Sequence, residues 1–420
     1  MADFTELGAT GLRTAGGVPD AEFLTWLKGS RGRAFYREMA LNSSTVGAIL
    51  YGLKTILKGL DWEVVPGENG DPDTADFVES CRIDMSQSWD QTIADICSMF
   101  IYGWSWHELV YKQRSGPDQV DPTKRSRFSD GRIGWRKWAP RSQDTMQRFQ
   151  FGTDGSLEGL VQQTVEAGTV TIPIDKSLLF RLDAENGNPE GQSLLRTAAV
   201  DWYYLKRVRE IEAIGIERDL AGLPVAYVPQ ESMLATATPQ DRQAYQQVVD
   251  TVARIKRNEQ EGLVLPHIVT DTGTIRSVDL QLMSSGGSRQ FNVSEVIQRY
   301  TNGIATSVMM DFLLLGQSVI GTQALATTKT DLWLQSIEAV ATAICDVVNS
   351  YAIPRLLQVN GITADPMPTL VYGQIQEDNL DALSTTLERL IRSGAVTPDT
   401  ALDEWTRAEF GLPAPDLTSE

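Results

Sequence analysis

The chain has 420 residues, of which 42% are hydrophobic and 22% charged, the balance of a folded globular protein of about two to four domains. Lysine and arginine number 37 against 55 aspartates and glutamates, so the formal net charge is −18. This charge argues against a protein that wraps nucleic acid in a basic surface, because such a surface supplies the affinity. A net negative charge is still compatible with a protein through which DNA passes without being bound tightly.

Histidine and cysteine are too few and too scattered to predict a metal site. The two histidines are His107 and His267, and the three cysteines (Cys81, Cys97 and Cys345) form no CxxC pair. We therefore expect buried, reduced thiols, as in a reducing compartment. The N-terminus lacks the pattern of a secretory signal, and no run of about 18 apolar residues predicts a membrane span.

The first 185 residues predict an α+β unit. Helical spacing covers 20–60, 72–83 and 89–102, and a short strand is expected at 61–66. An aromatic strand at 104–111 contains His107, which we expect to face outward. A polar surface loop follows at 113–131, and then come five strand-like pieces, at 133–138, 146–151, 157–164, 170–172 and 178–182.

The middle of the chain predicts a hairpin of two long helices with a small β-rich module at its tip. The helices are expected at 192–220 and 291–310, and strands between them at 225–228, 263–265 and 275–282. Thr238-Pro239-Gln240-Asp241 matches a capping box with proline at the first helical position, so another helix should begin there.

A third long helix is expected at about 326–351. Its apolar residues alternate at four- and three-residue spacing, which is typical of a narrow seam packed along another helix: Trp333, Ile337, Val340, Ile344, Val347 and Tyr351. A β-like piece at 369–372 precedes a helical C-terminus.

Two sets of residues are candidates for function. The first is an apolar, glycine-interrupted loop before the third helix: Leu313, Leu314, Leu315, Gly316, Gln317, Ser318, Val319, Ile320, Gly321, Thr322 and Gln323. The second is the basic group Lys206, Arg207 and Arg209 on the first long helix, which is either a solvated or inter-subunit salt-bridged face or a nucleic-acid contact. No nucleotide-binding loop or GxSxG is present, so no catalytic residue, metal or cofactor is predicted.

Several stretches of this chain resemble the Mu-like group of tailed-bacteriophage portal proteins. Asn42–Gly47 through Lys58–Val64 is similar to the family's N-terminal helix and strand. Asn188–Leu195 and Glu217–Val225, which open and close the first long helix, resemble its stem helix, and Leu313–Gln317 resembles its channel loop. The likeness runs over most of residues 40–415.

The resemblance implies an α+β portal-type fold. Its expected parts are a flexible N-terminus (1–19), an α+β wing (20–190), a first stem helix (191–221), a small β-rich clip (222–285), a second stem helix (286–311), a channel loop (312–327), a long channel-side helix returning to the wing (328–372) and a helical crown (373–420). The short C-terminus makes an extended crown barrel doubtful.

The resemblance also implies a non-enzymatic structural protein of the virion, assembled in the host cytoplasm. It would form a dodecameric ring at one capsid vertex for DNA packaging and ejection. Its partners would be double-stranded DNA, the terminase, the head-tail connector, the major capsid protein and scaffold, with no membrane. The alternatives are another head-tail component, or an acid-dependent hydrolase using a pair such as Asp61 and Glu63.

Overall fold

The computed structural model describes most of the chain. The described residues are 10–221, 223–228, 230–256, 267–270, 273–276, 279–283, 293–308, 310, 323–375, 388–389, 391–393 and 400–409. The chain divides into two compact units. Unit 1 comprises Met1–Glu22, Tyr51–Gly191 and Thr327–Glu420, and unit 2 comprises Phe23–Leu50 and Gln192–Ala326. The expected α+β class is confirmed, since both units combine helices with antiparallel strand pairs.

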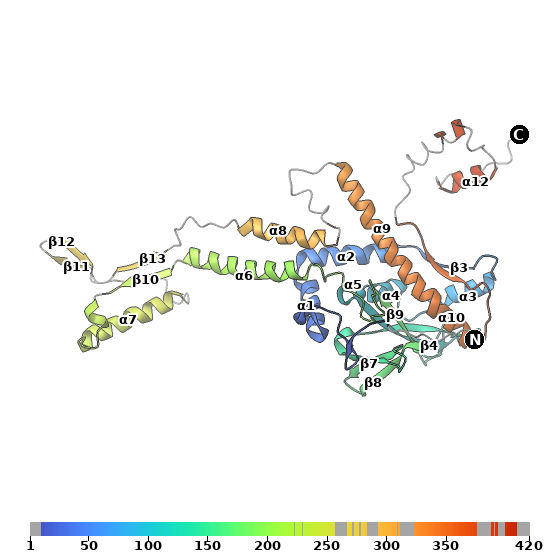
Figure 1. The fold of residues 1–420 in the computed structure, drawn as a ribbon, viewed down its shortest axis with the longest axis horizontal. Coiled ribbons are helices and arrows are strands. Elements are labelled where there is room, and N and C mark those ends of the chain that lie inside the picture. The colour runs from blue at the N-terminus through green and yellow to red at the C-terminus, as the bar shows by residue number, and fades with distance from the viewer. Residues whose placement is uncertain are drawn as a thin grey trace. The chain divides into compact units, whose positions relative to one another are not determined.

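Unit 1 is built around two three-stranded antiparallel sheets (Figure 1). The first has the order β5-β4-β9, with β4 (Trp104–Gln113) between β5 (Ile133–Arg141) and β9 (Ser177–Arg181). The second is the meander β6 (Met146–Phe151), β7 (Leu157–Thr164) and β8 (Gly168–Pro173). Trp104, Trp106, Met146, Phe149 and Leu160 form a buried apolar cluster that joins the two sheets.

A third, two-stranded sheet of unit 1 joins distant parts of the sequence. β3 (Trp62–Val65) pairs antiparallel with β14 (Thr369–Tyr372), so the strand expected at 61–66 has its partner about 300 residues later. The strand bounds expected at 369–372 are confirmed. At the other end of the chain, β1 (Thr14–Ala15) and β2 (Val18–Pro19) form a short hairpin, and the Phe149 N–H donates to the Gly17 carbonyl at 2.9 Å.

Three short helices pack in unit 1: α3 (Pro72–Ile83), α4 (Trp89–Ile96) and α5 (Ser98–Tyr102). Helix α3 has the bounds predicted from the sequence, because Asp71 caps it and Pro72 occupies its first turn. The single helix expected at 89–102 is instead two, since the backbone turns at Cys97.

The third long helix runs through α9 (Gln323–Val347), a π-helical turn η6 (Val348–Ala352) and α10 (Ile353–Val359). By length and composition, Thr330–Val359 is the one helix among the described residues that could cross a membrane. Part of it belongs to a protein core, because Ile337, Ala341, Ile344 and Val348 are buried. Tyr351, expected in the buried seam, is 51% exposed, since the π-turn inserts a residue and rotates the apolar face. The last described helix of unit 1 is α12 (Thr400–Glu409).

Unit 2 contains the helical hairpin that the sequence predicts. It begins with a 3-10 turn η1 (Thr25–Leu27), helix α1 (Gly29–Asn42) and the start of α2 (Ser44–Gly59), which runs on into unit 1. Helices α6 (Ala199–Ala221) and α8 (Val293–Thr306) lie side by side (Figure 1). Helix α6 starts seven residues later than expected, because 194–198 form turns.

Between α6 and α8 lies the expected small module. β10 (Leu223–Tyr227) pairs with β13 (Asp279–Met283), and β11 (His267–Thr270) pairs with β12 (Gly273–Arg276). The segment expected to be one strand at 275–282 therefore contributes to two strands, β12 and β13. The strand expected at 263–265 lies outside the described residues. Helix α7 (Pro239–Lys256) starts at the predicted capping box, since the Asp241 N–H donates to Thr238 Oγ1 at 3.2 Å.

Candidate functional site

The candidate loop before the third helix lies almost entirely outside the described residues. Leu313–Thr322 lie outside the described residues, and Gln323 is the first residue of helix α9. The structure does describe the basic group on helix α6 and the surfaces that surround it.

Lys206, Arg207 and Arg209 are all exposed on helix α6, but only the lysine has a partner among the described residues. Lys206 Nζ forms an ion pair with Glu38 Oε1 of helix α1 and lies 5.7 Å from the centre of the Trp202 ring. The hydrogen bond that Lys206 donates to the Glu38 carboxylate raises the pKa of Lys206 above its ordinary value. Lys206 therefore ties two helices of one chain together, while Arg207 and Arg209 project without a described acid.

The base of helix α6 is anchored by aromatic rings. Phe35 of helix α1 makes an edge contact with Trp202, with ring centres 5.0 Å apart, and a second edge contact with Trp26 at 4.8 Å. Trp202 and Leu205 are at most 5% exposed. Edge-to-face pairs of this kind add to the free energy of apolar burial, so this end of α6 is held rigidly within unit 2.

Helices α6 and α8 approach closely along their contact. Tyr204 stacks on Tyr300 with ring centres 6.1 Å apart. A Cβ atom placed on Gly303 would lie only 2.2 Å from Asp201 Oδ2, so a side chain at this position would displace the Asp201 carboxylate. Gly303 thus leaves room for the Asp201 side chain at the contact of the two helices.

Beyond its anchored base, helix α6 exposes apolar side chains. Between residues 206 and 216 none is buried, and Ile211, Ile214 and Ile216 are 65%, 48% and 53% exposed. Closer to the base, Val200, Tyr203 and Tyr204 are at least 40% exposed. Neighbouring exposed apolar residues of this size are typical of a surface that another protein covers.

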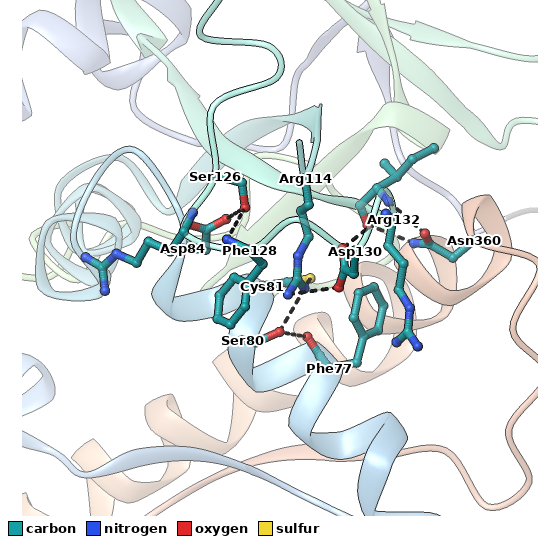
Figure 2. A network of polar contacts seen from close by, with 12 residues as sticks. Phe77, Ser80, Cys81, Asp84, Arg114, Ser126, Phe128, Asp130, Arg132 and Asn360 are labelled. Atoms are coloured by element: carbon teal, nitrogen blue, oxygen red, sulfur yellow. Dashed lines mark hydrogen bonds and ion pairs between the residues drawn. The ribbon is translucent and has the colours of Figure 1, made fainter. Parts of the chain in front are cut away.

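Unit 1 contains a buried ionic network at the base of the loop 113–131 (Figure 2). The Asp84 carboxylate, at the C-terminal end of helix α3, accepts from Ser126 Oγ at 2.6 Å and the Arg127 N–H at 2.9 Å, and pairs with Lys112 Nζ at 2.9 Å. Burial acts to raise the pKa of Asp84, but the hydrogen bonds from Arg127, Lys112 and Ser126 outweigh it and hold that pKa below its ordinary value.

Arg114 is the second centre of this network (Figure 2). Its guanidinium donates to Ser80 Oγ at 2.8 Å, pairs with Asp130 at 3.1 Å and lies 4.1 Å from the centre of the Phe128 ring. The loop expected to be a plain polar surface is therefore pinned at both ends to helix α3, while its basic residues Lys124, Arg125 and Arg127 stay exposed. Sequence reasoning missed these anchors because the partners lie 30 to 45 residues away.

His107 does not face outward, contrary to the expectation from the sequence. Its side chain is fully buried, because β4 is the central strand of its sheet and is covered on both faces. One imidazole nitrogen lies 2.8 Å from Ser105 Oγ, and burial lowers the pKa of His107 to about 4. The pair superficially matches a nucleophile and its base, yet Ser105 is only 1% exposed, so no substrate reaches it.

The remaining candidates for a catalytic or metal site among the described residues are acidic side chains and thiols. Asp61 and Glu63, the acidic pair considered for a hydrolase, are exposed beside and on strand β3. Within the part of the chain that the structure describes, no group of three His, Cys, Asp or Glu residues could hold a metal ion. Cys81, Cys97 and Cys345 are buried free thiols, as the sequence predicts.

This chain is similar to known proteins over nearly its whole length. The family model described as the portal protein of Mu bacteriophage matches residues 34–412. A chain from the neck of a native gene transfer agent (GTA) particle, computed with C12 symmetry, has 14% identity and a TM-score of 0.52, with 92% of this chain and 94% of that chain covered. A chain from the virion of the native GTA particle has 14% identity and a TM-score of 0.51, with 91% and 93% covered.

Proposed function

Because the chain belongs to the portal protein family of Mu-type bacteriophages, whose role is structural, we propose that it assembles into the ring-shaped DNA channel at one capsid vertex. The genome would be packaged and later ejected through this channel. The proposed ring has twelve copies, since the similar fold comes from a particle neck computed with C12 symmetry. The terminase would dock first and the head-tail connector later.

The observation that supports assembly most directly is the exposed apolar surface of helix α6. Ile211, Ile214 and Tyr203 are each more than 40% exposed, although the same helix is firmly anchored at its base. Burying such a side chain fully contributes about 1.5–3 kcal/mol. In a ring, each copy would cover this surface of its neighbour, so every interface between copies would be stabilised by that free energy.

The parts of the chain take their proposed roles from the family. Residues 20–190 would form the wing, helices α6 and α8 the stem, and the module 222–285 the clip that meets the terminase and connector. Leu313–Gln323 would form the channel loop, 328–372 the long helix beside it, and 373–420 the crown. The major capsid protein and the scaffold would be further partners during assembly.

The net charge suits a channel through which DNA slides. A ring of twelve copies at −18 each would carry roughly 216 negative charges. An acidic wall repels phosphates, so the duplex would meet few fixed binding sites. The sequence contains no nucleotide-binding loop, and we therefore assign the packaging ATPase to another protein.

The native mass of the purified chain, combined with negative-stain class averages, tests this proposal. The expected particle has twelve 46.4 kDa subunits, roughly 557 kDa, with a central hole. Replacing Ile211 and Ile214 by serine should abolish the ring and leave a folded monomer, because both side chains are exposed in the single chain. The matched control is Val165→Ser, a fully exposed turn residue of unit 1. A monomer at every concentration of wild type would refute ring assembly.

A deletion of 313–322 tests the proposed channel loop. We expect rings to form while DNA packaging or retention is impaired. Loss of the ring itself would instead identify these residues as a structural connector.

A further inference from the structure

The segment 112–141 of unit 1 carries a strong positive charge in an acidic chain. It contains nine of the 37 lysines and arginines but only three of the 55 aspartates and glutamates, a net charge of +6. The rest of the chain therefore carries −24. Three of the nine bases pair within the fold with Asp84, Asp130 and Glu108. Half of the other six lie within four positions of the loop 113–131, and we call them the basic turn: Lys124, Arg125 and Arg127.

The fold holds the backbone of the basic turn in place. The N–H groups of Lys124 and Arg125 both donate to the Asp121 carbonyl at 3.0 Å, which closes a tight turn. The Arg127 N–H donates to the buried Asp84 carboxylate at 2.9 Å, in the network of Figure 2. Since consecutive Cα atoms are about 3.8 Å apart, the Cα atoms of the three cations lie within about 11 Å of one another. The charges are thus gathered on a small, preorganised surface.

The side chains of the basic turn are exposed and keep most of their donors. Arg125 Nε donates to the Gln119 carbonyl at 2.8 Å, which uses one of the five N–H donors of its guanidinium. The adjacent acid, Asp121, accepts from the N–H and Oγ1 of Thr123 at 2.8 and 2.7 Å. That carboxylate is engaged by its own turn, so the cations remain available to an incoming anion.

The surface around the basic turn has the composition of a nucleic-acid contact. Val120 is the one large apolar side chain exposed in the segment 112–141, all of which the structure describes. Surfaces that bind another protein centre on apolar and aromatic anchors and are depleted of lysine. Contacts to a nucleic-acid backbone come mainly from arginine, lysine and hydroxyl donors. The basic turn therefore differs in kind from the isoleucine-rich surface of helix α6.

We propose that the basic turn binds the phosphate backbone of double-stranded DNA. The choice of a DNA duplex as the anion rests on the function proposed above, whereas binding itself requires no ring. The net charge of the chain does not prevent this contact, because charges more than about 8 Å apart are largely screened at physiological salt. Each cation that neutralises a phosphate also releases counterions, which favours binding. The basic turn is then a local contact for DNA on a protein that elsewhere repels it.

The test measures binding of the purified full-length chain to a fluorescent duplex of about 30 base pairs by anisotropy, over a series of salt concentrations. The Lys124→Gln, Arg127→Gln double variant removes two side chains that make no hydrogen bond or ion pair among the described residues, so it should keep the wild-type urea midpoint. We expect its affinity at about 50 mM salt to fall about tenfold or more. The slope of log affinity against log salt should shrink by about 2.

The matched control is Lys54→Gln with Arg148→Gln, which removes the same charge from exposed positions of helix α2 and strand β6. Its slope should change by less than about 0.5. Equal losses in the two double variants, or no binding of the wild type at about 50 mM salt, would overturn the inference. Displacement of the duplex by polyglutamate at equal total charge would assign the turn to an acidic protein and also overturn it.

The native mass of the same samples separates this inference from ring assembly. Wild-type rings that bind no duplex would overturn the DNA contact alone. A monomeric wild type whose DNA binding depends on Lys124 and Arg127 would overturn ring assembly and leave the DNA contact supported.

Discussion

Replacing Asp84 by alanine should strongly destabilise unit 1. The carboxylate lies in the buried ionic network of Figure 2, where its side chain is 4% exposed and that of Lys112 is 5% exposed. The substitution removes the negative charge but leaves the ammonium group of Lys112 buried. It also removes the acceptor for Ser126 Oγ and for the Arg127 N–H, which lie 2.6 and 2.9 Å away.

The expected loss follows from the burial of this pair. Breaking a buried ion pair by removing one partner costs about 3–5 kcal/mol, because an uncompensated charge stays in a poorly solvated place. The double variant Asp84→Leu, Lys112→Met removes both charges at similar volume. It should therefore recover most of the lost free energy of unfolding.

Urea unfolding followed by tryptophan fluorescence measures this effect. Trp104, Trp106, Trp135 and Trp138 are fully buried in unit 1, so their emission reports its unfolding. Asp118→Ala is the control, because Asp118 is an exposed acid of the same loop and should change stability by less than about 0.5 kcal/mol. A loss below about 1 kcal/mol for Asp84→Ala would refute the assigned role of the ion pair.

The pH dependence gives an independent check of the same reasoning. The folded pKa of Asp84 lies below its ordinary value, so its stabilisation is present above the unfolded pKa and is lost as the pH falls through the folded one. The difference in stability between wild type and Asp84→Ala should therefore be full at pH 6 and shrink in acid below about pH 4. A difference that stays constant down to pH 3 would contradict an ionic origin.

Three further predictions concern buried groups and helix packing. Burial raises the pKa of the thiols of Cys81, Cys97 and Cys345 to about 11, 12 and 12, so a thiol reagent should modify the native chain only after denaturant is added. His107 has a pKa of about 4 in the folded chain and about 6.5 in the unfolded chain, so on acidification the unfolded chain binds a proton before the folded chain does. The free energy of unfolding should therefore fall by about 3 kcal/mol between pH 6.5 and 4. In urea titrations, His107→Leu should reduce this dependence of stability on pH. Gly303→Leu should lower the thermal midpoint by crowding the Asp201 side chain at the contact of α6 and α8, whereas Gly215→Ala, with open space at its Cβ position, should leave it unchanged or raise it.

Local signals in the sequence predicted most of the elements. The bounds of helix α3 and of strands β6, β7 and β14 agree with the periodicity and turn residues that predicted them. The capping box at Thr238 starts helix α7 as expected. Such signals succeed because caps and alternation act between residues only a few positions apart.

Contacts across the chain were beyond the reach of these signals. The partner of strand β3 comes from about 300 residues later, and Asp84 meets Ser126 across 42 positions. Lys206 pairs with Glu38 of the same chain, 168 residues away, whereas the alternatives from the sequence were a solvated or inter-subunit salt-bridged face and a nucleic-acid contact. No local pattern encodes which acid a given base will meet.

The sequence by itself determined the portal family, the α+β class, the helix–module–helix order and the acidic charge of this protein. Only the tertiary structure decided that His107 is buried, that helix α6 leaves its isoleucines exposed, and that Lys206 pairs with Glu38. The reason is physical: an element forms from the preferences of neighbouring residues, whereas burial and charge pairing depend on which distant surfaces cover it.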